Sequence, residues 1–559
     1  MKTTEIKNEK FYYNKLSYDY IFNFEKLKDF FSYDYRTDAS FSSRIDYVKN
    51  SYNNKFRKII AGSLLEYNSS MNCGYRTIEN INLLKKDNTL VVIAGQQPAI
   101  FTGAIFAIYK ILTVLNTAEY LKNKFKMDVI PLFWNASDDN DLPEIKSIKI
   151  SEGQLEKISI DVPEYLSGFS YSKMILPIDE FENVSRKMLD NLNVSDYKKD
   201  ITVFLEEIIE NLKTGNKRSG ISISKFYSLI LSKLFNKSGL VIIDPEIPEI
   251  KKLATTLIDF DINNINKINS LIDFNSRELV SEGYHEQLKL MKGNMDFFLN
   301  TENGRERIKS RSENSFIFEK SFKTKKNELD KNSLKDIIFK NISNVGLNVI
   351  LRPLFQDFIL PNIATVCGPG EISYYAQLKD VYTLFGSELP ILYPRMSATL
   401  IENKVKKAVS KINMNYEDLE SNQDILAGKI LKKMLGFDFS NYLDNLESEM
   451  EAVLKKYLEE IKKYDIESVD AAFGRINQNL KKEIEILGRK VINDSKRKNG
   501  LIVESVSKIY NNILPCGKLQ EREINVFEFI NKYGFQIIDE VSSDFKVFQF
   551  LHKFIELKQ

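Results

Sequence analysis

The segment TLVVIAG (residues 89–95) is a continuous apolar run that follows Asp87 and ends in a glycine. Strands buried on both faces of a parallel sheet look like this, because helices cover both faces of such a sheet. A second apolar run, VIPLFW (residues 129–134), comes after residues 103–124, whose apolar side chains recur at roughly the three-and-four spacing of a helix. The sequence therefore predicts a strand-helix-strand unit with a right-handed crossover, the beginning of a doubly wound α/β fold.

The alternation of helix and strand patterns continues at widely separated positions of the chain. We expect a helix over residues 221–235, followed by strands over residues 240–244, 348–352 and 390–393. Residues 146–219 and about 262–334 mix short apolar stretches with polar runs, and we expect them to be insertions into the sheet domain. The predicted core, residues 1–400 with these two insertions, is thus a parallel sheet assembled from distant parts of the sequence.

A different pattern, typical of long charged helices, extends over residues 401–514. Apolar residues follow one another at spacings of mostly three and four in two runs: Leu443, Leu446, Met450, Val453, Tyr457 and Ile461, then Phe473, Ile476, Leu480, Leu487 and Val491. This heptad spacing predicts a coiled coil, and the break near residues 464–468 leaves two arrangements open, an antiparallel hairpin within the chain or a coil that forms a homodimer. After a helix break at Pro515, residues 515–559 are rich in aromatic side chains and are expected to pack back on the body.

The overall charge and the scarcity of two residue types exclude several classes of protein. With 79 Lys and Arg residues against 77 Asp and Glu residues the formal charge is only +2, too small to attract a nucleic acid or an anionic membrane. No window is apolar enough to cross a bilayer, and the polar first ten residues do not resemble a secretion signal. The three cysteines fit neither a disulfide framework nor a zinc site, and the two histidines rule out zinc sites of the HExxH kind. We therefore expect a cytoplasmic protein without structural zinc and without nucleic-acid or membrane partners.

Candidate ligand-binding residues follow directly after the predicted strands, where the ligand crevice of an open parallel sheet lies. After the first strand, Gln96 and Gln97 lead into Thr102 and Gly103. Free backbone N–H groups at the start of the next helix would provide a site for a phosphate or a carboxylate. A tight strand-helix turn with polar caps explains the same residues equally well, so the spacing alone leaves both interpretations open.

After the second strand, Trp134 is followed by a cluster of carboxylates at Asp138, Asp139 and Asp141. Such a cluster binds an amine or a hard cation, or shares a proton so that one member acts as a base. The alternative is an acidic helix N-terminus, which needs fewer aspartates than this segment has. We therefore favour a functional site here.

Two further polar segments contain candidate ligands for an anion. The first contains Arg352 and Gln356, followed by Gly368, Gly370 and Glu371 in a Gly-Pro-Gly turn. The second contains Arg395 and Ser397. An arginine can grip a carboxylate with two hydrogen bonds and the glycine turn offers backbone N–H groups, although ordinary turns show the same spacing. Cys367, next to the turn, fits a small buried residue better than a nucleophile.

Taken together, these segments resemble one family. AGQQPAIFTG, PLFWNASDDND, RPLFQDFILP, CGPGEISYYAQLK, YPRMSATLIE and PCGKLQER are similar, in this order, to the hallmark segments of the bacillithiol cysteine-adding enzymes (BshC). The resemblance implies a Rossmann-type core similar to nucleotidylyl transferases, two connecting insertions and a coiled coil that pairs two subunits. It also implies a ligase that joins the carboxyl group of cysteine to the amine of glucosaminyl malate, with ATP or another nucleotide as a candidate activating cosubstrate.

The acidic segment departs from the family pattern. It usually reads Glu-Asp-His-Asp in the family, whereas this chain has an asparagine, Asn140, in place of the histidine. Asp139, Asn140 and Asp141 are the candidate catalytic residues. Because an asparagine cannot accept a proton as an imidazole does, Asp139 or Asp141 is expected to act as the base that frees the acceptor amine. The resemblance gives the remaining candidate residues a role in binding substrate or nucleotide. The alternatives are a nucleotide-binding module, against which the missing histidine pair argues, and a non-catalytic or divergent coiled-coil homologue.

Overall fold

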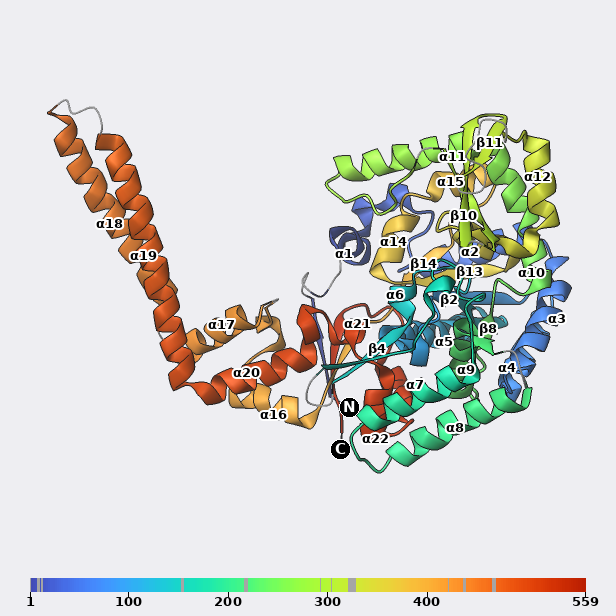
Figure 1. Ribbon diagram of the computed structural model, residues 1–559, viewed down its shortest axis with the longest axis horizontal. Helices are drawn as coiled ribbons and strands as arrows, with labels where there is room; N and C mark the ends of the chain where they lie inside the picture. The colour runs from blue at the N-terminus through green and yellow to red at the C-terminus, as the bar shows by residue number, and fades with distance from the viewer. Residues whose placement is uncertain are drawn as a thin grey trace.

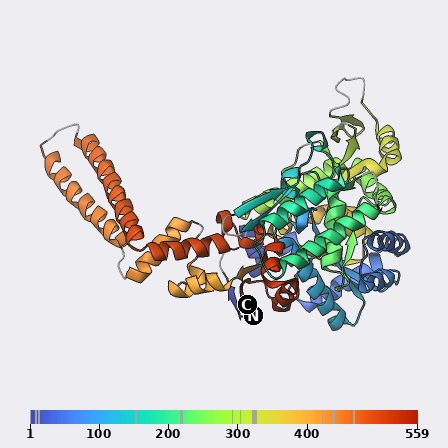
Figure 2. The same ribbon diagram turned by 60° about the horizontal axis from the view of Figure 1, so that its bottom comes forward.

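The computed structural model covers most of the chain. It describes residues 2–7, 11, 14–151, 155–215, 220–291, 293–302, 304–319, 328–420, 422–435, 439–464 and 469–558. A rounded body built around a parallel sheet carries a long helical arm (Figure 1 and Figure 2). None of the helices in the described part of the chain combines the length and the apolar character needed to cross a bilayer.

A five-stranded parallel sheet lies at the centre of the body, in the strand order β14-β13-β2-β3-β8. Its strands are β2 (Leu90–Gln96), β3 (Val129–Asn135), β8 (Val241–Ile243), β13 (Asn362–Cys367) and β14 (Ile391–Pro394). The chain runs outward from β2 through β3 to β8 and later places β13 and β14 on the other side of β2. The strand order therefore reverses between β2 and β13, and ligands of open parallel sheets bind at such a point.

Helix α5 (Phe106–Phe125) joins β2 to β3 and packs against both strands, with a buried face that includes Ile108 and Ile111. The other helices of the core are α1 (Lys15–Phe22), α2 (Asp38–Ser51), α3 (Phe56–Ser69), α4 (Tyr75–Leu83), α9 (Ile223–Leu234), α14 (Pro369–Tyr375) and α15 (Lys379–Phe385). Among them, α2 packs on β13 and α3 packs on β8. The predicted α/β core with a parallel sheet is confirmed.

The predicted strand at residues 348–352 is wrong, because this segment forms the start of a helix. The side chain of Asn348 accepts hydrogen bonds from the backbone N–H groups of Ile350 and Leu351, at 2.8 and 3.1 Å. The helix is α13 (Leu351–Ile359). Pro353 suits its first turn but cannot donate a hydrogen bond to a central strand. The sheet strand of this region is β13, which follows α13.

Two insertions extend the core between its strands. The first, between β3 and β8, contains α6 (Leu142–Ile145), β4 (Ser147–Ser151), β5 (Leu155–Ser159), β6 (Ile175–Leu176), α7 (Ile178–Asn191), α8 (Lys198–Gly215) and β7 (Ile221–Ser222). The second, between β8 and β13, contains α10 (Pro248–Lys252), α11 (Thr255–Ser281), β9 (Asn294–Thr301), β10 (Gly304–Ser312), β11 (Ser315–Phe318), α12 (Lys331–Lys340) and β12 (Val345–Leu347). Strands β9 to β12 form an antiparallel sheet in the order β11-β10-β9-β12.

The arm follows the sheet domain in the sequence. Its helices are α16 (Asn403–Lys411), α17 (Gln423–Leu435), α18 (Phe439–Lys462), α19 (Val469–Lys498) and α20 (Gly500–Ile513). Helices α18 and α19 extend away from the body as an antiparallel pair (Figure 1). Lys481 of α19 forms ion pairs with Glu447 (2.9 Å) and Glu451 (2.7 Å) of α18. The hairpin within the chain is therefore present; residues 465–468, part of the predicted break, lie outside the described residues.

The predicted heptad seam is only partly the contact between α18 and α19. Leu443 belongs to it, because a Cβ added at Gly488 of α19 would lie 2.7 Å from Leu443 Cδ1. Five other residues of the predicted runs are exposed instead: Met450 (37%), Val453 (54%) and Tyr457 (54%) on α18, and Ile476 (45%) and Leu487 (45%) on α19. Leu454 and Leu458 of α18, which are not part of the predicted runs, are half-buried instead. Because α18 has apolar residues on two adjacent stripes, spacing alone does not show which stripe faces α19.

The C-terminal segment returns to the body and meets the first residues of the chain. Strand β16 (His552–Glu556) pairs in parallel with β15 (Ala398–Ile401) and antiparallel with β1 (Lys2–Ile6). The helices before it are α21 (Gln520–Glu523), α22 (Val526–Tyr533) and α23 (Ile537–Asp544). Helix α22 packs on α8 and α23 packs on α5. The residues before and after the arm thus lie side by side.

Candidate functional site

Two adjoining cavities open at the carboxyl ends of β2, β3 and β13. The inner cavity has a volume of about 560 Å³ and the outer cavity a volume of about 790 Å³. Gln96, Gln97, Phe106, Glu144 and Arg522 line both of them, so the two cavities form one crevice. Its position next to the reversal of strand order is the position expected of a ligand site.

The inner cavity gathers side chains from distant parts of the chain. Its lining includes Gln96 and Gln97 after β2, Trp134, Asp138 and Asp139 after β3, Arg305 on β10, Arg352 and Gln356 on α13, Gly368, Gly370, Glu371 and Tyr374 at the start of α14, and Arg395 after β14. Thr102 and Gly103 line the outer cavity instead. Of the residues singled out in the sequence, Asn140, Asp141 and Ser397 are not part of the lining of either cavity.

Four residues that line the inner cavity each contain a buried polar atom without a hydrogen-bond partner among the described residues. The atoms are Trp134 Nε1, Asp138 Oδ1, Gln356 Nε2 and Arg395 Nε. A buried polar atom left without a partner costs about 1–3 kcal/mol, so four in one place call for an explanation. Three of them are donors and one is an acceptor. They fit a cavity wall that a ligand rich in oxygen atoms completes.

The acidic edge of the inner cavity is formed by Asp138, Asp139 and Glu144. Burial raises the pKa of Asp138, although nearby positive charges oppose this rise. Burial, followed by the neighbouring carboxylates of Asp141 and Asp139, raises the pKa of Glu144 as well. A carboxylate with a raised pKa is better suited to take up a proton near neutral pH. This edge therefore contains the candidate general base.

Asn140 supports the site from behind the lining. Its side-chain oxygen accepts a hydrogen bond from Arg305 Nη1 at 2.8 Å. Asp141 is exposed and precedes the short helix α6. Of the three residues predicted to be catalytic, only Asp139 lines the inner cavity. The geometry thus favours Asp139, together with Glu144, over Asp141 as the acting carboxylate.

Arg305 reaches the inner cavity from the second insertion. Its guanidinium lies over the ring of Phe298, 3.6 Å from the ring centre, and Nη1 lies 3.9 Å from Asp139 Oδ1. Arg352, on α13, also lines this cavity, as do Arg395 and Arg522. Guanidinium groups bind carboxylates and phosphates with two parallel hydrogen bonds. The cavity is therefore able to hold an anion beside an edge that attracts an amine.

The loop after β14 is attached to the C-terminal segment. Arg395 Nη2 lies 2.6 Å from Glu521 Oε1, and both side chains are buried. Ser397 Oγ donates to Glu521 Oε2 at 2.8 Å and lies 2.8 Å from His552 Nδ1, while Thr399 Oγ1 contacts the other ring nitrogen at 2.9 Å. Burial lowers the pKa of His552 to about 4, so the imidazole is neutral at physiological pH. Ser397 and His552 thus hold the loop in place.

The turn after β2, at the wall of the outer cavity, has an unusual backbone. Phe101, Thr102 and Gly103 have positive φ angles of 48°, 73° and 70° in succession. Positive φ at a residue other than glycine is strained, and such strain persists only where the surroundings hold it. Asn525 Nδ2 does so by donating to the carbonyl oxygens of Phe101 (2.7 Å) and Gly103 (2.5 Å).

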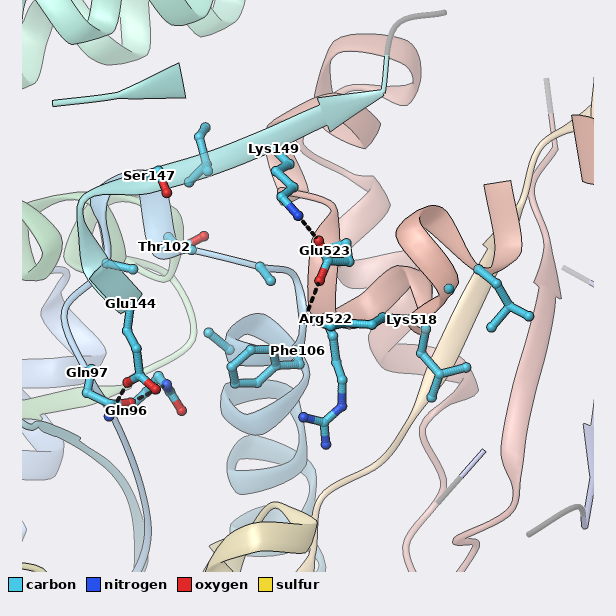
Figure 3. Close-up of a pocket in the computed structure, with 18 of the residues that line it drawn as sticks. Gln96, Gln97, Thr102, Phe106, Glu144, Ser147, Lys149, Lys518, Arg522 and Glu523 are labelled. Atoms are coloured by element: carbon cyan, nitrogen blue, oxygen red, sulfur yellow. Dashed lines mark hydrogen bonds and ion pairs between the residues drawn. The ribbon is translucent and has the colours of Figure 1, made fainter. Parts of the chain in front are cut away.

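Basic side chains enter the outer cavity from β4 and from the C-terminal segment (Figure 3). Lys149 and Lys518 both form ion pairs with Glu523, the latter at 3.4 Å. In Figure 3 the guanidinium of Arg522 extends past Phe106, and Arg522 lines both cavities. The outer cavity therefore combines cationic groups with apolar walls.

Cys367 is the cysteine next to the Gly-Pro-Gly turn. The thiol is buried, and burial raises its pKa, so it is not a thiolate nucleophile at neutral pH. Within the described ranges, no group of three or more His, Cys, Asp or Glu side chains is arranged to hold a metal ion.

The residues of the inner cavity that were not singled out in the sequence include the polar side chains Lys110, Gln287 and Arg305. Lys110 could have been found from the sequence, because it is a lone charge on the buried face of α5 and lysines are rarely buried without a partner. Gln287 and Arg305 lie in the second insertion, where no recognised pattern marked them. Arg522 belongs to the PCGKLQER segment, which resembles the family but was not predicted to be part of the site.

The fold and the crevice define a Rossmann-like protein with a site for a small polar ligand. Comparison with protein families is more specific. The model "Bacillithiol biosynthesis BshC, N-terminal Rossmann-like domain" matches residues 1–396, and "Bacillithiol biosynthesis BshC, C-terminal coiled-coil domain" matches residues 398–557. The chain therefore belongs to the BshC family.

Several curated proteins are similar to the chain over nearly its whole length, under the name "Putative cysteine ligase BshC". The protein from Natranaerobius thermophilus is 27% identical, with 94% of each chain covered. The one from Chlorobium phaeobacteroides is 29% identical over 92% of this chain and 91% of its own, and one from Bacillus cereus is 24% identical over 94% of each. The family resemblance stated for the sequence is thus confirmed.

Proposed function

We propose that the protein is a cysteine ligase of bacillithiol biosynthesis, which forms an amide bond between the carboxyl group of cysteine and the amine of glucosaminyl malate. The observation that carries this proposal is the presence in one cavity of the carboxylates Asp139 and Glu144 and the guanidinium groups of Arg305 and Arg352. The names of the relatives support it. The proposal keeps the cytoplasmic location expected from the sequence.

In the proposed reaction the acidic edge acts on the acceptor amine. The amine binds as an ammonium ion, which Asp139 and Glu144 attract by charge. It must lose a proton before it can attack the carboxyl carbon of cysteine, and a carboxylate with a raised pKa accepts that proton. Glu144 fits this role because burial and two neighbouring carboxylates raise its pKa. The new C–N bond then forms as a leaving group departs from the carboxyl carbon.

The guanidinium groups act on the anionic parts of the substrates. The malate part of the acceptor has two carboxylates, and Arg352 and Arg305 have the geometry to hold such groups. A free carboxylate is a poor acceptor for an amine, and an activating nucleotide would supply the leaving group that makes it reactive. The oxygen-rich character expected of the ligand agrees with the unpartnered donors of Trp134 and Gln356.

Mass spectrometry tests the proposal. Purified protein is given cysteine and glucosaminyl malate, with and without ATP and cell extract, and the product bacillithiol is sought. We expect product from the wild-type protein under at least one condition and a loss of more than a hundredfold with Asp139→Asn. Absence of product under every condition, beside an active family member as control, would reject the ligase.

We further propose that the arm pairs with the arm of a second copy. The exposed large apolar residues of α18 are Tyr442, Met450, Val453 and Tyr457. At 100° per residue they fall on one side of the helix, and Ile476 and Leu487 continue the apolar surface on α19. Because the surface extends over both helices, a second hairpin of the same kind is the partner that covers it, in a four-helix bundle with two-fold symmetry.

A further inference from the structure

A chain of directional hydrogen bonds crosses the crevice and begins at a buried lysine. Lys110 Nζ lies 2.6 Å from Glu371 Oε2, 2.8 Å from the carbonyl oxygen of Gly95 and 3.1 Å from Gln96 Oε1. The side chain is only 4% exposed. An ammonium group has three N–H donors and no acceptor, so these three contacts use all of them. Gln96 is therefore held with its side-chain oxygen toward Lys110.

From Gln96 the chain continues in one direction. Gln96 Nε2 donates to Gln97 Oε1 at 2.8 Å, and Gln97 Nε2 donates to Glu144 Oε2 at 2.7 Å. Gln97 Nε2 also lies 3.4 Å from Asp139 Oδ2. Gln96, Gln97 and Glu144 lie against one another at the wall that the two cavities share (Figure 3).

The two ends of the chain require the same orientation of both glutamines. A lysine can only donate hydrogen bonds, whereas an ionised carboxylate can only accept them. If either amide were turned over, an oxygen would face an oxygen or an N–H group would face the ammonium. The orientation of Gln97 toward the acidic edge therefore depends, through Gln96, on Lys110.

We propose that Lys110 is a positioning residue of this site, which acts through Gln96 and Gln97 to direct amide N–H groups at the carboxylates Glu144 and Asp139. The proposal rests on the proposed function, because it assigns Lys110 to the carboxylates that accept the proton of the amine. A purely structural lysine would only tie β2 to the start of α14, through Gly95 and Glu371. The two roles predict different effects of removing Lys110 on the pKa of Glu144.

An N–H group that donates to a carboxylate stabilises its charged form, so loss of the donor raises the pKa of the acid. The pKa of Glu144 is already raised by burial and by Asp141 and Asp139. Tyr171 is also within electrostatic range of Glu144. The charged groups that share the outer cavity with it are Lys149, Lys518, Arg522, Glu420 and Glu523. Apart from Asp139, which Gln97 also contacts, none of these groups is part of the chain from Lys110, so they stay in place when the chain is broken.

The test follows the carboxyl signal of Glu144 during a pH titration of the full-length protein labelled with ¹³C at glutamate carboxyl groups. The signal is assigned by its absence in Glu144→Gln. The first variant combines Lys110→Met with Glu371→Gln, because removal of one member of a buried ion pair leaves the other unpaired. We expect the pKa of Glu144 to rise by about one unit in this variant and in Gln97→Leu.

The decisive comparison is the variant that combines Lys110→Met, Glu371→Gln and Gln97→Leu. If Lys110 acts through the glutamines, the combined variant shows no further rise beyond that of Gln97→Leu alone. Additive rises, or an unchanged pKa without Lys110, would overturn the proposal. Lys122→Met, on the exposed side of α5, is the matched control and should leave the pKa unchanged.

Two further measurements keep the test decisive. Should the first variant fail to fold, Gln96→Leu interrupts the same chain one step later and is expected to give the same rise, whereas an unchanged pKa would reject the chain. In active protein, the acidic limb of the pH profile of kcat/KM should move to higher pH by the same amount. Because the titration needs no turnover, coupled pKa shifts without bacillithiol formation would reject the ligase and retain the hydrogen-bond chain.

Discussion

Arg395 and Glu521 form a buried ion pair, with 2.6 Å between Nη2 and Oε1, that connects the loop after β14 to the segment after the arm. The other carboxylate oxygen of Glu521 accepts hydrogen bonds from Ser397 Oγ and from the backbone N–H of Ala398. One carboxylate of the C-terminal segment therefore fixes the loop that presents Arg395 to the inner cavity.

Removal of one member of this pair should be more harmful than removal of both. Glu521→Ala leaves the guanidinium of Arg395 buried without its partner, and we expect a loss of about 3–5 kcal/mol in the free energy of unfolding. Arg395→Met combined with Glu521→Leu leaves no unpaired charge and should cost less. Denaturant unfolding measures both, with the exposed Glu540→Ala as control. A double variant that is less stable than Glu521→Ala would contradict the expectation.

The acidic segment gives a prediction that separates two neighbouring aspartates. Asp139 lines the inner cavity, whereas Asp141 is exposed. We expect Asp139→Asn to lower kcat by at least a hundredfold, the range of general acid-base catalysis, and Asp141→Asn to change it by less than about threefold. Steady-state kinetics measures the two values, and thermal unfolding confirms that both variants are folded. Equal losses would show that the lining of the cavity does not identify the acting carboxylate.

Asn140 and Arg305 give a prediction about the unusual residue of this segment. Asn140 accepts a hydrogen bond from Arg305, and a histidine at this position also offers a ring nitrogen as acceptor. Asn140→His should therefore keep activity, while Asn140→Leu, which leaves Arg305 Nη1 without this acceptor, should lower kcat/KM by about tenfold. Activity that is lost in both variants would mean that the amide itself has a role.

The outer stripe of the arm predicts the effect of charge on association. Val453→Glu combined with Tyr457→Glu places carboxylates in the proposed interface but leaves the half-buried Leu454 and Leu458 unchanged. We expect a dimer for the wild-type protein and a monomer for the variant by light scattering after size exclusion. Lys455→Glu, an exposed position outside the stripe, is the control and should remain dimeric. A wild-type monomer at micromolar concentration would contradict the proposed pairing.

His552 predicts a pH dependence of stability. Its pKa is about 4 in the folded protein, because burial disfavours the charged ring, against 6.5 for an exposed histidine. Between these values the unfolded chain binds a proton that the folded protein does not, so the free energy of unfolding falls as the pH is lowered from about 6.5 toward 4. The expected loss between pH 7 and pH 5 is about 2 kcal/mol. Denaturant unfolding of His552→Gln should lack this part of the decline; an identical pH dependence in both proteins would contradict it.

Much of the core could be predicted from the sequence, because its signals are local. The apolar runs of β2 and β3 and the helix between them are each readable within one window, and the polar residues after the strands meet in the crevice as the parallel arrangement requires. The strand predicted at residues 348–352 was wrong because Asn348 caps a helix there, an effect of one side chain on two backbone groups. Local sequence patterns therefore predict helices and strands well where the whole segment is buried.

The missed parts of the site depend on contacts between distant residues. Arg305 approaches Asp139 from a separate sheet. Ser397 donates a hydrogen bond to Glu521, which is 124 positions away in the sequence. No periodicity encodes such contacts. Lys110 is the exception, since a lone charge on an apolar helix face is visible in the sequence and needs a buried partner.

The strained turn at residues 101–103 has a consequence for the order in which the protein is made. The amide that holds the carbonyl oxygens of Phe101 and Gly103 belongs to Asn525, which lies 424 and 422 positions further along the chain and is synthesised long after the turn. Until then the growing chain has its central sheet without a finished outer cavity. A growing chain that ends before Asn525 therefore contains the strands of the central sheet but lacks the side chain that holds this wall of the outer cavity.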